Sequence, residues 1–433
     1  NFLVSRVTQD LFEGNSYIGF LSTIYNDSKM TDYVNSVDML SYLWDNQLVV
    51  DWQFINSQMG ESGNGLSFEM NYNPTEQSLY SWIDFEYFDK ALYINDVGYL
   101  YRNNLKKVQG GVGFYWPELE LPLPILDGRV NLNFNKMSNL DDLVLNNSLG
   151  LSSTITFNNL WFLGCGFNYL AEHNDDLLLY DYHSELKVKN DRLGPSIMIP
   201  SGINIDAYLG NDPHGKYTIN SSLLFWRNDY EDGNLQSISF GVNPSEYIDF
   251  NFKYRRSISD EDYRWIEEFS AKYIFASSHN QSQKYIYEMN YIHSRKTSIQ
   301  LYAEYYTNNN NFGQYYEYQD SIKFYDEIEE SSLYYTYEDI LAGQIDVELE
   351  LSPQDHVYHY TKDQILNLNL VLNYEFRPGS NVYVVYSVYR DVVGKQMNSF
   401  SDFLNYTPHD DTDLSEVNFT QSLFLKMDYW FDF

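Results

Sequence analysis

The most constraining feature of this 433-residue chain is a regular alternation of apolar and polar positions at its C-terminal end. Between residues 423 and 433 every second residue is apolar, and the intervening positions include Lys426, Asp428 and Asp432. A period of two places successive side chains on opposite faces of a β-strand. An apolar face opposite a charged face, closing on a terminal Phe, is typical of the last strand of a bacterial outer-membrane barrel. The alternative is the edge strand of a soluble sandwich.

The same alternation recurs in pairs of segments that are joined by tight turns. Residues 366–376 and 382–388 flank Pro378-Gly379, a strong turn signal. Further short turns are expected at 12–15, 44–46, 158–159, 212–216, 243–246, 294–297 and 377–380. Longer polar connections are expected at 171–202, 257–280, 308–363 and 391–416. Short turns at one end and long loops at the other predict about 19 strands of about ten residues each.

These patterns predict an all-β fold, namely a large transmembrane antiparallel β-barrel of the outer-membrane type. The expected barrel has more than about 18 strands, short periplasmic turns and long extracellular loops. Residues 1–433 are interpreted as a single barrel domain. Since bacterial barrels usually close with an even number of strands, we expect the mature protein to carry at least one further N-terminal strand.

Composition excludes several classes of protein. The formal charge is −34, from 61 acidic and 27 basic residues, and no basic run offers a site for phosphates, so a nucleic-acid partner is disfavoured. No apolar run is long enough for a transmembrane helix. The single Cys excludes a disulfide scaffold. The expected location is the bacterial outer membrane, with the lipid bilayer as one partner and a surface or periplasmic protein as a further partner.

Alternation also predicts which polar residues line a lumen. A wide barrel encloses water, so the polar face of each strand should point inward. The predicted lumen-facing residues are Asn367, Asn369, Glu375, Arg377, Asp249, Asn251, Lys253, Glu304, Lys426 and Asp428.

Two loop clusters are candidate ligand sites. Aromatic residues beside acids suit stacking on sugars or peptides, although a self-packed loop or extra extracellular β-hairpins are the alternative. These residues are Tyr315, Tyr316, Tyr318, Tyr334, Tyr335 and Tyr337. Asp410, Asp411 and Asp413 could bind Ca²⁺ weakly, although a hydrated acidic surface is the alternative. No other cofactor is expected.

One hairpin carries a family resemblance. Residues 373–380, Asn-Tyr-Glu-Phe-Arg-Pro-Gly-Ser, together with Val384-Val385-Tyr386, resemble the "WEYRPGS…FLVY" hairpin of the bacterial barrel family called domain of unknown function 5916. Weaker similarities follow in the same order at 6–18, 95–102, 273–276, 297–305 and 427–431. The chain departs from the pattern at Asn373, where Trp is usual. The resemblance implies an outer-membrane barrel that is often fused to a domain like carbohydrate-binding module family nine, so an upstream periplasmic domain is expected before residue 1. It implies no catalytic residue.

Three functions remain open at this point. The first is a channel or an uptake and translocation component with a polar lumen. The second is a plugged barrel that serves as a membrane anchor or as an assembly subunit of a larger cell-surface complex. The third is an outer-membrane hydrolase, which we do not expect because no serine lies in a recognisable nucleophile elbow.

Overall fold

The computed structural model describes residues 2–26, 31–59, 61–74, 78–95, 100–117, 124–176, 196–229, 231–269, 272–318, 362–393, 395, 397, 399–407 and 416–431. Nineteen of the described strands belong to a single antiparallel sheet. Contacts divide the chain into two units, each described by itself. Unit 1 contains residues 1–157, 165–204 and 322–324, and unit 2 contains residues 158–164, 205–321 and 325–433.

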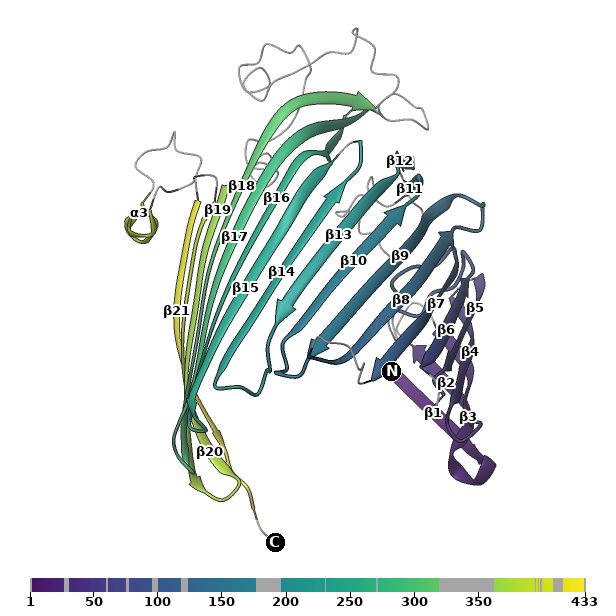
Figure 1. Cartoon of the computed structure of the whole chain (residues 1–433), viewed down its shortest axis with the longest axis horizontal. Helices are drawn as coiled ribbons and strands as arrows, with labels where there is room; N and C mark the ends of the chain where they lie inside the picture. Colours follow the sequence, from purple (N-terminus) through teal and green to yellow (C-terminus); the bar gives the residue numbers. More distant parts are fainter. Residues whose placement is uncertain are drawn as a thin grey trace. The chain divides into compact units, whose positions relative to one another are not determined.

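Unit 1 is a meander in which each strand pairs with its sequence neighbour (Figure 1). Its strands are β1 (Phe2–Leu11), β2 (Ser16–Asn26), β3 (Thr31–Leu43), β4 (Leu48–Met59), β5 (Glu61–Tyr72), β6 (Leu79–Phe88), β7 (Leu105–Pro117), β8 (Ile125–Ser138) and β9 (Val144–Phe157). A 3-10 turn, η1 (Phe12–Gly14), follows β1, and a small hairpin pairs β11 (His173–Asp175) with β12 (Ile197–Ile199).

Unit 2 repeats this arrangement with longer strands. Its strands are β14 (Tyr217–Arg227), β15 (Asp232–Ser245), β16 (Ile248–Phe269), β17 (Lys272–Ser294), β18 (Thr297–Tyr318), β19 (Lys362–Arg377), β20 (Ser380–Val393) and β21 (Glu416–Asp428), with one helix, α3 (Phe400–Asn405). Two more strands, β10 (Phe162–Leu170) and β13 (Gly202–Gly210), are divided between the units. The predicted fold class and the strand count are confirmed.

All the predicted short turns join antiparallel neighbours. The turn between β19 and β20 contains Pro378 and Gly379, and Gly379 adopts a φ of 77°, which glycine adopts at little cost. We call the end of each strand that meets these turns the turn end, and the opposite end the loop end.

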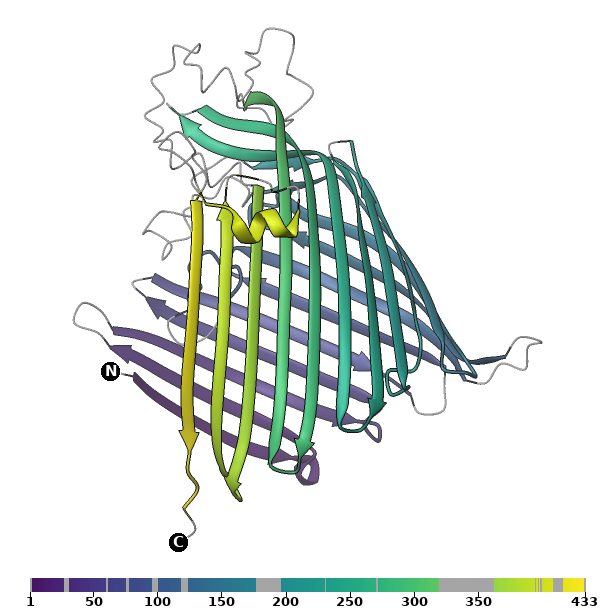
Figure 2. The same cartoon turned by 90° about the vertical axis from the view of Figure 1, so that its left-hand side faces the viewer.

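The predicted long connections at 257–280 and 308–363 are partly wrong. The strands β16, β17 and β18 contain 22, 23 and 22 residues, so the prediction of about ten residues per strand fails for them. The ladder between β16 and β17 continues to the pair Phe269 and Lys272. Figure 2 shows these green strands extending past the ends of β19–β21. Strand segments with water on both faces need no apolar alternation, so the sequence lacks the signal on which the prediction depends.

The register of unit 2 gives the sheet two chemically distinct faces. One row of directly opposed residues is apolar and comprises Phe250, Met289, Leu301, Leu370, Tyr386 and Leu423. The adjacent row is polar and comprises Asn251, Glu288, Tyr302, Asn369, Ser387 and Ser422. Opposed residues in an antiparallel pair share a face, so each row runs across the sheet on one side. We call these sides the apolar face and the polar face.

Helix α3 covers a charged residue on the apolar face. Arg390 is opposite Leu366 in the ladder, yet it is only 8% exposed. Its guanidinium donates to the carbonyl oxygens of Phe403 at 2.9 Å and Tyr406 at 2.6 Å. Phe403 is itself buried and contacts the ring of Tyr305. The helix therefore satisfies a cation that the apolar face would otherwise leave without partners.

Candidate functional site

The candidate site is built on the polar face of unit 1, and β6 shows why. Its residues alternate between Ile83, Phe85 and Tyr87 on one face and Trp82, Asp84 and Glu86 on the other. The polar positions are opposite Glu69 and Ser67 in β5, and Gln109 and Lys107 in β7. Period-two alternation thus brings charged side chains from successive strands together on one face.

The charged residues surround a cavity of about 400 Å³, which we call the acidic pocket. It is lined by Arg6, Tyr17, Asp38, Asp51, Gln53, Ser67, Phe68, Glu69, Asp84 and Glu86. Arg6 pairs with Asp38 at 2.8 Å, and Lys107 lies 3.4 Å from both Asp84 and Glu86. Asp51 and Glu69 are directly opposed across the β4–β5 ladder. Within the described residues neither has a cationic partner, so carboxylates outnumber cations around this pocket.

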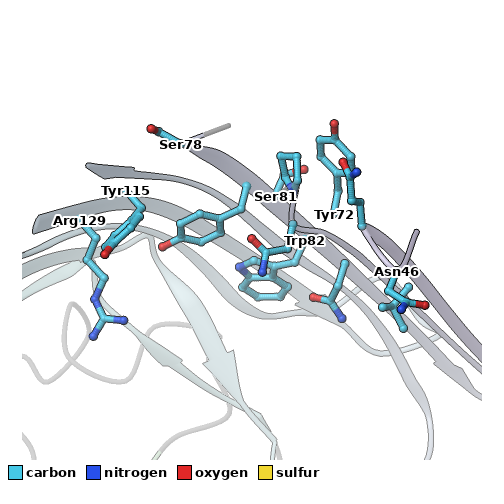
Figure 3. Close-up of a pocket in the computed structure, with 13 residues that line it drawn as sticks. Asn46, Tyr72, Ser78, Ser81, Trp82, Tyr115 and Arg129 are labelled. Carbon is cyan, nitrogen blue, oxygen red and sulfur yellow. The ribbon is translucent and has the colours of Figure 1, made fainter. Parts of the chain in front are cut away.

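A second cavity, of about 860 Å³, lies at the turn end of the same unit, and we call it the aromatic pocket. Its lining is Asn46, Gln47, Val49, Asn71, Tyr72, Asn73, Pro74, Ser78, Tyr80, Ser81, Trp82, Tyr115 and Arg129. Figure 3 shows Tyr115 and Arg129 projecting on the same side of the strands, with the ring of Tyr72 on the opposite side. Tyr72 packs edge-on against Trp44 at 6.2 Å between ring centroids.

Two glycines make room for the rings of this pocket. Gly111 is opposite Trp82 and Gly113 is opposite Tyr80 in the β6–β7 ladder. A Cβ at Gly111 would overlap the indole nitrogen, and one at Gly113 would overlap the Tyr80 ring. The Tyr80 hydroxyl donates to the side-chain carbonyl of Asn131. Each aromatic side chain therefore lies across a glycine of the neighbouring strand, which holds it close to the sheet.

The turn that borders the aromatic pocket has an unusual backbone. Trp44, Asp45 and Asn46 adopt φ values of 52°, 54° and 67°, so three consecutive non-glycine residues are left-handed. Such residues cost roughly 1–2 kcal/mol each, and Asn tolerates the conformation best. Strain of this kind concentrates at functional positions.

The segment between β6 and β7 folds inward onto the polar face, and we call residues 89–95 and 100–104 the inward segment. Leu92 is fully buried with Phe88 and Leu105. A Cβ at Gly63 would overlap the backbone of Leu92, so only glycine permits this approach. The inward segment therefore covers the loop end of the polar face in this unit.

Polar contacts hold the inward segment in place. Asn103 donates to the carbonyl oxygens of Lys90 and Leu92, at 2.8 and 3.2 Å. Arg102 pairs with Asp176 at 2.7 Å, with both side chains under a tenth exposed. The Tyr101 hydroxyl donates to Glu86 at 2.8 Å, which ties the segment to the acidic pocket. Burial, and then this bond to a carboxylate, raise the pKa of Tyr101 above its ordinary value.

Most of the predicted lumen-facing residues make polar contacts in unit 2, in several separate small groups. Glu288 accepts from Asn251 at 2.8 Å and pairs with Lys253 at 3.0 Å. Further contacts join Asp249 to Asn290, Glu304 to Lys284, Asn369 to both Asn367 and Ser387, and Lys426 to Asp428.

Two of the predicted residues lie at the β19–β20 turn. Glu375 accepts from the Gly379 amide at 2.9 Å. Arg377 lies beyond a register shift and donates to the Tyr429 hydroxyl at 2.8 Å. A lumen-lining role for the ten residues stays a prediction.

The two predicted loop clusters fall largely outside the described residues. Tyr334, Tyr335, Tyr337, Asp410, Asp411 and Asp413 all lie there. Tyr315, Tyr316 and Tyr318 belong to β18 and pair with β17, so they lie on a strand and not in a loop. Among the described residues, no group of three or more His, Cys, Asp or Glu side chains has a geometry that could hold a metal ion.

Sequence reasoning missed both pockets of unit 1. The signal that could have found them is the alternation in 80–87, which places Tyr80, Trp82, Asp84 and Glu86 on one face. None of the helices in the described ranges combines the length and the hydropathy that a membrane span requires.

Fold and site together define an antiparallel β protein of the outer-membrane barrel type, with one apolar and one polar face. The model of the family described as domain of unknown function (DUF5916) matches residues 1–433, and the chain belongs to this family. Among curated proteins, none matches this chain.

Three solved structures show distant similarity. The siderophore receptor PirA from Acinetobacter baumannii is 8% identical, over 96% of this chain and 74% of that chain, with a TM-score of 0.40. OmpT, an outer membrane protein of Vibrio cholerae, is 10% identical, over 73% and 89%, with a TM-score of 0.29. The CymD monoaromatic hydrocarbon channel is 9% identical, over 90% and 82%, with a TM-score of 0.17.

Proposed function

We propose that this protein resides in the bacterial outer membrane and acts as a channel or uptake component with a polar lumen. The observation that carries the proposal is the separation of apolar and polar residues into opposite faces, row by row, across β16–β21. In a bilayer the apolar face of such a sheet contacts lipid, while the polar face encloses water.

The dimensions of the apolar face support a membrane location. Phe376 lies beside the ring of Tyr429 at the turn end, and Tyr305 stacks with Tyr285 near the loop end, where Tyr305 is opposite Leu366. From Leu366 to Phe376 the strand advances by ten residues, or about 33 Å at about 3.3 Å per residue. At the usual strand tilt of about 40°, this length projects to about 25 Å, the height of the apolar band of outer-membrane barrels.

Exposure on the last strand points the same way. Leu423 and Leu425 are 71% and 75% exposed. Contiguous exposed apolar residues on this scale are unfavourable in water and mark a surface that another apolar medium covers.

The acidic pocket supports a preference for cations. Asp38, Asp51, Glu69, Asp84 and Glu86 line this pocket. Among the described residues, their negative charges are paired with two cations, Arg6 and Lys107. Rings of carboxylates raise the local concentration of cations and exclude anions. The polar face of unit 1 is therefore suited to cationic and neutral solutes at this level.

The test is conductance of the full chain in planar bilayers. We expect stepwise openings and a reversal potential in a salt gradient that favours cations. Replacing Asp51→Asn together with Glu69→Gln should reduce the cation preference. Asp142→Asn should not, because Asp142 lies in the β8–β9 connection and does not line the acidic pocket. This control should fold, since Asn suits the φ of 64° at position 142. Silence of a well-inserted barrel would overturn the channel proposal.

A second candidate function is a plugged barrel that anchors or assembles a surface complex. The inward segment favours it, because buried contacts and the Arg102–Asp176 pair fix this segment over the polar face. This candidate predicts no conductance by inserted wild-type protein, and currents only after the inward segment is displaced.

A further inference from the structure

We infer that the aromatic pocket binds a saccharide that carries a carboxylate, such as a short oligomer of a uronic acid. The inference rests on the proposed function, since it requires the polar face of unit 1 to meet water and solute. It assigns a ligand class to a cavity that is lined by strands β4–β8, by the β3–β4 turn and by the β5–β6 connection.

The rings of the pocket are placed for stacking. Trp82 and Tyr80 lie across Gly111 and Gly113, which fixes one face of each ring against the sheet. Neither Trp82 nor Tyr115 makes a ring contact with another aromatic residue within the described part of the chain. The indole N–H of Trp82 likewise has no acceptor there. A sugar ring offers C–H groups for the aromatic faces and hydroxyls for the donor.

Charge separates this pocket from its neighbour. No Asp or Glu lines the aromatic pocket, although the chain has 61 acidic residues against 27 basic ones. Arg129, its one basic lining residue, is exposed and has no carboxylate partner among the residues described. A guanidinium binds a carboxylate through two parallel hydrogen bonds. The pocket therefore favours an anionic ligand, whereas the acidic pocket beside it repels one.

The turns supply the remaining polar groups. Asn46, Gln47 and Asn73 line the pocket, and in the described structure their side-chain amides have no hydrogen-bond partner. The left-handed turn at Trp44, Asp45 and Asn46 places the first two of these amides at the border of the cavity. Its volume of about 860 Å³ is within the range of about 300–1,000 Å³ that is usual for small-ligand sites.

The test is isothermal titration of the purified full chain in detergent with trigalacturonic acid, and with maltotriose as an uncharged trisaccharide. Wild type should bind trigalacturonic acid more tightly than maltotriose. Arg129 is exposed, so Arg129→Gln should be tolerated by the fold. It should weaken the binding of trigalacturonic acid at least about tenfold, which is the effect of losing one charge-assisted hydrogen-bonded pair. Trp82→Ala should weaken the binding of both sugars. Arg227→Gln, an exposed arginine of β14, is the matched control and should change neither.

Three results would overturn the inference. The first is no binding of either sugar by folded wild type. The second is binding of trigalacturonic acid by Arg129→Gln that equals the binding by wild type. The third is tighter binding of a tripeptide than of the sugars. Because binding is measured in detergent, it is independent of current. A conducting barrel that binds no saccharide contradicts this inference alone, and a silent barrel that binds trigalacturonic acid contradicts the channel proposal alone.

Discussion

Position parity decides the environment of a single residue in this sheet. In β19, Leu370 belongs to the apolar row between Leu301 and Tyr386, and Asn369 belongs to the polar row between Tyr302 and Ser387. The two residues are adjacent in sequence and equally distant from the strand ends. They provide a matched pair for testing which face meets lipid.

Leu370→Arg should destabilise the inserted protein by about 2–4 kcal/mol, the cost of an arginine on a lipid-facing position at the bilayer midplane. Asn369→Arg should be tolerated, because the new guanidinium enters water. Urea-dependent folding into lipid vesicles measures both variants. Similar losses in the two variants would contradict the assignment of faces.

The left-handed turn of β3–β4 is a second residue-scale feature. Asp45 has no interior partner within the described residues, yet its φ of 54° costs an L-residue more than it costs glycine. Asp45→Gly should therefore raise stability by about 1 kcal/mol in the same assay. Gln47→Gly, in the same turn at ordinary φ, should lower stability by about 0.5–1 kcal/mol. A loss of stability in Asp45→Gly would argue against strain in this turn.

At the scale of elements, the inward segment is the feature that sequence could not reveal. It depends on residues 63 and 92 meeting, and an isolated glycine in a strand gives no indication of what approaches it. The β19–β20 hairpin and β21 could be predicted because alternation and a Pro-Gly turn are local signals. The outer parts of β16–β18 could not, because polar strand segments lack that alternation. The pockets of unit 1 could be predicted only in part. The alternation of their side chains is visible in the sequence, but bringing those side chains together requires the register of several strands.

Gly63→Ala should displace the inward segment, because the new methyl group occupies the position of the Leu92 backbone. Limited trypsin digestion should then cleave faster after Lys90 and Arg102. The control is Gly150→Ala in β9, where the nearest atom to a new Cβ is the side-chain oxygen of Asn168 at 3.3 Å. That oxygen can move, so digestion of the control should resemble wild type. Unchanged cleavage in Gly63→Ala would show that the segment is not held by this contact.

At the scale of the whole molecule, the apolar band and the net charge set the conditions for folding. The band of about 25 Å in β19 is shorter than the roughly 30 Å hydrocarbon core of a typical bilayer. A charge of −34 keeps chains apart in solution but also opposes insertion into anionic lipid surfaces.

Folding yield should therefore be higher in vesicles of short-chain phosphatidylcholine than in vesicles of long-chain phosphatidylcholine, because mismatch costs free energy for every ångström. The folded fraction is measured by its altered migration in gel electrophoresis or by its protection from protease. Replacing part of the lipid by phosphatidylglycerol should slow folding at low salt, and added salt should relieve the effect. A folding yield that does not depend on the acyl chain length of the lipid would contradict the assigned height of the apolar band.

The pairing of each strand with its sequence neighbour affects the rate and the order in which the strands can fold. Because every ladder within β1–β9 and within β14–β21 joins consecutive strands, native contacts are mostly close along the chain. Contacts of this kind form quickly, since little loop-closure entropy is lost before each pairing. A chain of this kind can grow one hairpin at a time as it is delivered, and the longest interval within either series separates β18, which ends at Tyr318, from β19, which begins at Lys362.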